Sequence, residues 1–101
     1  MAQIQIREIN RGLRVYDLTH VWYNDNAYKL FKEATRDDIA TVLSLLLATL
    51  RDPGMLETNI YEFRDVTLVV VADPHDFGCD YHMLLIDHAS EFIGYRRATI
   101  E

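Results

Sequence analysis

The stretch from Arg36 to Arg51 is the feature that most constrains how this chain folds. Projected at about 100° per residue, its apolar side chains fill an arc of roughly 160°. They are Ile39, Ala40, Val42, Leu43, Leu46, Leu47 and Leu50. Thr35 and Asp38 form a weak variant of a capping box at its start, and Asp52-Pro53-Gly54 ends it, because a residue before proline leaves the α region. We therefore expect one long helix lying across a sheet, with Leu45 outside its buried arc.

The rest of the chain is rich in strand patterns. Residues 3–7 and 13–16 alternate polar and apolar side chains around Asn10-Arg11-Gly12, which predicts a hairpin. Its inward side chains would be Ile4, Ile6, Leu13 and Val15. Residues 57–63 and 66–72 predict a second hairpin, and residues 81–86 a further strand.

Two segments are less regular. Residues 27–34 have helical spacing behind Asp25 or Asn26, either of which can cap a short helix. The tail from residue 90 fits a short helix or an edge strand, and we favour the strand. The expected order is β-β-α-α-β-β-β with an optional last strand. This is an α+β fold with a mostly antiparallel sheet of five to six strands and helices packed on one face.

One compact domain, residues 1–101, is expected, because two domains would leave about 50 residues for each core. Neither a P-loop nor a GxGxxG pattern occurs, so a nucleotide-binding doubly wound fold is not indicated. A lone cysteine cannot form an intrachain disulfide, and no leader-like or membrane-spanning run occurs, so we expect a cytoplasmic protein.

The net charge of −6 is unevenly distributed. Residues 1–51 carry seven basic and six acidic side chains, whereas residues 52–101 carry three basic and ten acidic ones. An acidic half of this kind repels a phosphate backbone or an anionic membrane, so we expect no direct binding to nucleic acid or membranes. It suits either ordinary solubility or recognition of a basic partner, including mimicry of nucleic acid.

The segment from Asp73 to His82 gathers chemistry-bearing side chains. Three of them, together with the next histidine, are weak candidates for a metal site: His75, Cys79, His82 and His88. Their spacing matches no familiar zinc motif, and a polar loop between two strands is the alternative interpretation. Cys79 and His82 could be drawn as nucleophile and base, but no oxyanion site is marked. We assign no catalytic residue and no cofactor.

Residues 20–28 combine tryptophan, tyrosines and asparagines, the composition of a contact surface. Alternatively Trp22 and Tyr23 cover the end of the sheet. The leading hypothesis is a small non-enzymatic protein-binding domain, an inhibitor or adaptor of a larger basic partner, a profile shared with inhibitors made by viruses and mobile elements. The candidate partner-binding residues are Trp22, Tyr23, Asp73, Asp76, Asp80 and Tyr81. A metal-binding enzyme or sensor and a homodimeric or homo-oligomeric structural protein are the alternatives.

Overall fold

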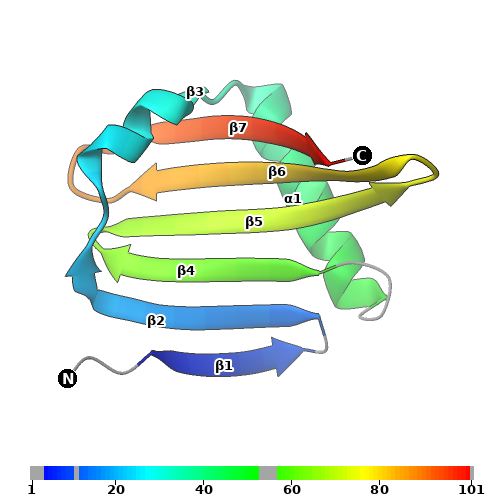
Figure 1. The fold of residues 1–101 in the computed structure, drawn as a ribbon, viewed down its shortest axis with the longest axis horizontal. Coiled ribbons are helices and arrows are strands. Elements are labelled where there is room, and N and C mark those ends of the chain that lie inside the picture. The colour runs from blue at the N-terminus through cyan, green and yellow to red at the C-terminus, as the bar shows by residue number, and fades with distance from the viewer. Residues whose placement is uncertain (1–3, 11, 53–56, 101) are drawn as a thin grey trace.

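A single seven-stranded sheet dominates the computed structural model, which describes residues 4–10, 12–52 and 57–100 (Figure 1). The strand order is β1-β2-β4-β5-β6-β7-β3. The strands are β1 (Gln5–Asn10), β2 (Leu13–Trp22), β3 (Lys32–Glu33), β4 (Thr58–Arg64), β5 (Val66–His75), β6 (Gly78–Asp87) and β7 (Ile93–Ile100). One α-helix, α1 (Arg36–Arg51), and one 3-10 helix, η1 (Asp25–Leu30), complete the described part.

The expected α+β fold with five to six strands and helices on one face is therefore wrong. Segments expected as loop or helix are extended instead. Residues 17–22 continue β2, and residues 73–75 and 78–80 continue β5 and β6 up to a tight turn. The helix expected over residues 27–34 is only η1, which ends at Phe31 with extended dihedral angles, after which β3 begins. The tail is strand β7, as favoured.

The connection between β2 and β4 gives the fold its shape. These two strands are parallel, whereas the other five neighbouring pairs in the sheet are antiparallel. Parallel neighbours need a crossover, and this one uses both faces of the sheet. The chain leaves β2 through η1 on one face, adds β3 beside β7 at the far edge, and returns as α1 across the other face (Figure 1).

On the α1 face, the helix packs through Ile39, Val42 and Leu45. Beneath them lie Val69, Val71, Leu84 and Tyr95. The helix bounds and the capping box of Thr35 and Asp38 are confirmed. The predicted buried arc is wrong in its orientation: Leu43, Leu47 and Leu50 are 48%, 51% and 40% exposed, whereas Leu45 packs on the core.

The buried side of α1 includes a polar contact that an apolar arc cannot reveal. Thr49 Oγ1 lies 2.9 Å from Thr58 Oγ1 of β4, and both residues are fully buried. Val42 and Thr49 are two helical turns apart and therefore lie on one line along the helix. This line faces the sheet, so Leu43, Leu47 and Leu50 lie on the flank of the helix. The expected Pro53-Gly54 turn lies outside the described residues.

The part of the chain that the structure describes covers the opposite face only at one end. There Leu85 is completely buried, and Phe31 and Phe92 lie above Gly94, where an added Cβ would come within 2.7 Å of the Phe31 Cβ. Figure 1 views the sheet from this face, and no described element lies over the other end of its central strands. A side chain at position 94 would therefore displace the aromatic cover.

The first hairpin is confirmed, but its predicted inward set is only half right. Leu13 and Val15 are buried, whereas Ile4 and Ile6 are each 59% exposed. The register pairs Arg7 with Val15, and directly opposed residues share a face. Ile6 therefore points to the other face of the sheet, because neighbouring residues of a strand alternate.

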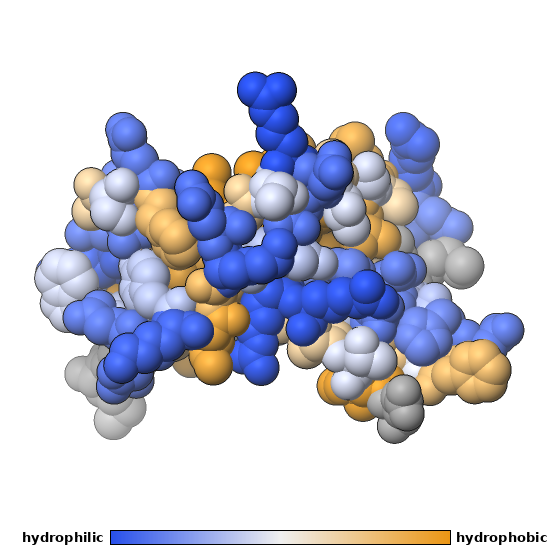
Figure 2. Space-filling model, turned by 90° about the horizontal axis from the view of Figure 1, so that it is seen from above, coloured by the Kyte–Doolittle hydropathy of each residue, from blue (hydrophilic) through white to orange (hydrophobic). Residues whose placement is uncertain are grey.

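The β7 edge is polar in character. Figure 2 looks onto this edge, which β3 completes, and shows hydrophilic side chains over most of it with hydrophobic ones between and around them. No helix in the described residues has the length and apolarity to cross a membrane.

Candidate functional site

Two clusters of polar and aromatic side chains lie at opposite ends of the sheet. One, the Trp22 pocket, adjoins Val66 at the start of β5, and the other, the Asp80 cluster, adjoins His75 at its end. Ten residues of strand separate them, about 30 Å at about 3.3 Å per residue. The two clusters are therefore independent candidate sites.

The Trp22 pocket is a cavity of about 140 Å³ where β2, η1, the β4–β5 turn and the end of β6 meet. It is lined by Trp22, Tyr23, Asp25, Tyr28, Arg64, Asp65, Val66, Asp87 and Ala89. Pockets for small-molecule ligands usually hold about 300–1,000 Å³. This cavity is smaller and has the size of one amino-acid side chain.

The aromatic residues of this pocket differ in role. Tyr23 packs edge-on against Phe63 at 5.0 Å and Tyr28 at 5.7 Å between ring centroids, and burial raises the pKa of Tyr23. Trp22 is 66% exposed, and the Arg64 guanidinium lies 4.9 Å from its ring centroid. Tyr23 is therefore part of the packing, whereas the indole ring of Trp22 is available to a partner.

Three carboxylates line the same pocket. The Tyr28 hydroxyl donates to Asp87 Oδ2 at 2.8 Å, and the backbone amides of Ala89 and Ser90 donate to Asp87 Oδ1. These bonds, that of Tyr28 first, hold the pKa of Asp87 below its usual value, while burial raises that of Tyr28. Asp25 and Asp65 are exposed. Arg64 is the one basic residue of the described lining, so the pocket keeps an excess of negative charge.

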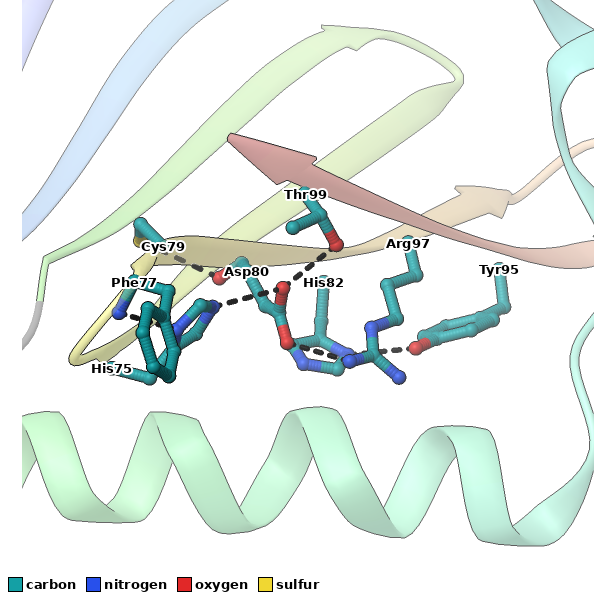
Figure 3. Close-up of polar contacts among 8 residues, drawn as sticks. All are labelled: His75, Phe77, Cys79, Asp80, His82, Tyr95, Arg97 and Thr99. Atoms are coloured by element: carbon teal, nitrogen blue, oxygen red, sulfur yellow. Dashed lines mark hydrogen bonds and ion pairs between the residues drawn. The ribbon is translucent and has the colours of Figure 1, made fainter. Parts of the chain in front are cut away.

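The Asp80 cluster lies on the α1 face, where side chains of β5, β6 and β7 point toward the helix (Figure 3). Asp80 is 7% exposed and accepts hydrogen bonds from Arg97 at 2.6 Å and Thr99 at 2.7 Å. His75 Nε2 lies 3.4 Å from the same carboxylate. The bonds from Thr99 and Arg97 hold the pKa of Asp80 below its usual value. The Asp80 charge is therefore compensated within the chain.

Next to Asp80, His82 is 6% exposed and its Nδ1 lies 2.7 Å from the Tyr95 hydroxyl. Asp73 lines an open pocket of about 470 Å³ together with Asp37, Thr41 and Ser44 of α1. Potential ligand atoms of Asp73, Asp80 and His82 all lie within 4.8 Å of one another. Two carboxylates and an imidazole therefore converge beside an opening to solvent.

The structure does not bring the predicted partner-binding residues onto one surface. Trp22 and Tyr23 line the Trp22 pocket, whereas Asp73 and Asp80 belong to the far end. There Asp76 is exposed in the β5–β6 turn, and Tyr81, by strand alternation, faces away from Asp80.

The predicted metal set is also divided. His75 and His82 lie on the Asp80 side, but Cys79 faces the other side of the sheet. The His88 ring pairs with Thr67 at 2.9 Å, near the Trp22 end of the sheet. His75, Cys79, His82 and His88 therefore do not form one site, because alternation along the strands and the length of β6 separate them.

Several residues of both clusters were missed by sequence reasoning: Asp25, Tyr28, Arg64, Asp65, Asp87, Tyr95, Arg97 and Thr99. Pairing β6 with β7 places Thr99 opposite Asp80 and Arg97 opposite His82, so a correct register for the tail would have found two of them. The lining of the Trp22 pocket comes from four separate segments and had no local signal.

No known protein family, curated protein or solved structure matches this chain. The chemistry of the two clusters therefore carries the functional argument. An exposed indole face with nearby carboxylates attracts a cationic side chain. Carboxylates with an imidazole are groups that bind divalent metal ions.

Proposed function

We propose that this chain is a small non-enzymatic protein-binding domain that seats one lysine or arginine side chain of a larger basic partner in the Trp22 pocket. The observation that carries the proposal is the lining of this cavity of about 140 Å³ by an exposed tryptophan and three carboxylates, Asp25, Asp65 and Asp87. By occupying a basic surface, the domain would act as an inhibitor or an adaptor. Its net charge of −6 supports fast, oriented association with such a surface.

The chain itself supplies an example of the expected contact. Arg64 stacks on Trp22 at 4.9 Å, and its Nε makes a long hydrogen bond of 3.4 Å to the Thr19 carbonyl oxygen. A cation over a tryptophan face contributes about 0.5–1 kcal/mol when exposed and about 2 kcal/mol when desolvated. A partner side chain that displaces Arg64 and is covered by the partner would therefore bind the ring more strongly than Arg64 does.

Titration with short amidated peptides tests this proposal, with Trp22 as the reporter because it is the single tryptophan of the chain. Peptides with a central arginine or lysine should change the Trp22 fluorescence, whereas the same peptides with a central glutamine should not. The double variant D25N/D65N should weaken binding about tenfold. Asparagine keeps Asp65 in its left-handed conformation, with φ of 62°, while removing the charge.

The matched control is D73N/D76N, which makes the same charge change at the opposite end of the sheet. Its affinity should stay within about twofold of the wild type, because charges farther apart than a Debye length are screened. If D73N/D76N weakens binding as much as D25N/D65N, the acids predicted from the sequence steer the partner and the Trp22 pocket does not.

The same variants extend to the natural partner. A single cysteine suits a reducing compartment, so we propose that the domain acts in the cytoplasm. A basic protein captured from that compartment at low salt should be retained by D73N/D76N and lost by D25N/D65N. The reverse pattern would overturn the assignment of the pocket.

Self-association is a second candidate, favoured by the edge strand β1. Ile4, Ile6 and Ile9 at this edge are 59%, 59% and 65% exposed. Exposed apolar edge strands pair readily with a second chain. Sedimentation should then show a dimer that Ile6→Lys dissociates, and a wild-type monomer at tens of micromolar would exclude this candidate.

A further inference from the structure

Two potential metal ligands on the α1 face can accept a further partner. The carboxylate of half-buried Asp73 and Nε2 of His82 make no hydrogen bond among the described residues. His82 is 6% exposed, and both groups lie beside the buried Asp80 carboxylate. No buried side-chain nitrogen or oxygen of the described residues lacks a hydrogen-bond partner, so these two groups are open to solvent. Two carboxylates close together repel each other, and a cation bound between them and the imidazole would relieve this repulsion.

We propose that Asp73, Asp80 and His82 bind one divalent zinc ion. Zinc binds histidine nitrogen and carboxylate oxygen ligands at about 2.0–2.2 Å, which places tetrahedral ligands about 3.4 Å apart. The three ligand atoms now lie within 4.8 Å of one another, so an approach of at most about 1.4 Å suffices. Asp73 can make this movement, because it lines the open pocket beside α1.

The surroundings of His82 fit a ligand role. If Nδ1–H donates to the Tyr95 oxygen, 2.7 Å away, the lone pair of Nε2 is free for the metal. In Figure 3 one ring nitrogen of His82 meets Tyr95, and the other lies below the Asp80 carboxylate. The pocket of about 470 Å³ that Asp73 lines beside α1 would let water or a small ligand reach the Asp73 side of the site.

Arg97 is the built-in competitor for this ion. Its guanidinium lies 2.6 Å from Asp80 Oδ2, and Thr99 donates to Oδ1. A carboxylate oxygen has two lone pairs, so Oδ1 can serve Thr99 and a metal together. Removing the positive charge of Arg97 should therefore strengthen zinc binding, an effect opposite in sign to that of removing a ligand.

Calorimetric titration of the full chain with zinc chloride, at constant pH, tests the site. One ion should bind per chain, and D73N and His82→Ala should each weaken binding at least about tenfold. Arg97→Gln should strengthen it. D76N, the same change three residues further along the chain, should match the wild type, and so should His88→Ala. The ¹⁵N resonance of His82 Nε2 should shift on zinc addition.

Equal affinities for wild type, D73N and D76N would overturn the site. So would loss of binding in Cys79→Ala with retention in D73N, which would place zinc on the thiol. His82→Ala removes a buried side chain, so circular dichroism should first confirm that this variant is folded. If it is not folded, D73N decides the result, because Asp73 is only half-buried. The proposal is independent of the Trp22 pocket: D25N/D65N should leave zinc binding unchanged.

Discussion

The two ends of the sheet stabilise a charged carboxylate in different ways. At the Trp22 end, Asp87 is held by a neutral phenol, Tyr28, and by backbone amides. At the other end, Asp80 is held by the cationic Arg97 as well as by Thr99. Both partners lower a pKa, but only Arg97 cancels a charge. The negative charges at the Trp22 end can therefore attract a cation from outside, whereas the charge of Asp80 is compensated within the fold.

The largest expected effect distinguishes the core of the Trp22 end from the flank of α1. Leu85→Ala should lower the free energy of unfolding by about 3 kcal/mol, because Leu85 is fully buried and its removal leaves a cavity. Leu43→Ala makes the same chemical change at a side chain that is 48% exposed. It should cost less than about 0.5 kcal/mol. Equal losses in denaturant unfolding would mean that the flank of α1 is covered.

A smaller effect concerns the threonine pair between α1 and β4. Thr49 donates to the Leu45 carbonyl oxygen at 3.1 Å, so Thr58 must donate to Thr49. Thr49→Val should cost about 1–2 kcal/mol, since it leaves the buried Thr58 hydroxyl unpaired. Thr58→Val should cost less, and the double variant no more than Thr49→Val alone. Additive losses in urea unfolding would show that the two hydroxyls are not energetically coupled.

Acid unfolding should compare the two carboxylates directly. The folded pKa values of Asp80 and Asp87 lie below the unfolded value of about 3.9, so the unfolded chain binds more protons. Their stabilisation is present above about pH 4 and is lost as the pH falls through the folded pKa values. D80N and D87N should each flatten the loss of stability below about pH 4. If either variant loses stability with falling pH as steeply as the wild type does, that carboxylate does not contribute to acid unfolding.

The smallest effect on stability is expected at the two exposed aromatic side chains. Trp22→Ser and Phe77→Ser should each change the free energy of unfolding by less than about 0.5 kcal/mol, because both side chains are exposed. Only Trp22→Ser should abolish binding of a lysine or arginine peptide, measured by fluorescence polarisation of a labelled peptide. A loss with Phe77→Ser instead would move the partner surface to the β5–β6 turn.

The sequence predicted local structure well and long-range placement poorly. The bounds of α1, its capping box and both hairpins follow from neighbouring residues. The buried side of α1 includes the contact of Thr49 with Thr58, and the exposure of Ile6 depends on a register that places Arg7 opposite Val15. Similarly, Trp22 was identified from composition, but its acidic neighbours Asp65 and Asp87 come from distant turns. Such contacts leave no periodic signal in the chain.

The parallel pairing of β2 with β4 also predicts the order in which the parts of the sheet fold. Leu13 pairs with Thr58 across 45 residues, whereas β4 to β7 form a meander joined by short turns. Closing the long loop costs more chain entropy, so the meander is expected to form first in folding and to open last. The Asp80 cluster lies wholly within the meander, but the Trp22 pocket exists only once the crossover has closed. Amide protection at Trp22 should therefore report completion of the fold.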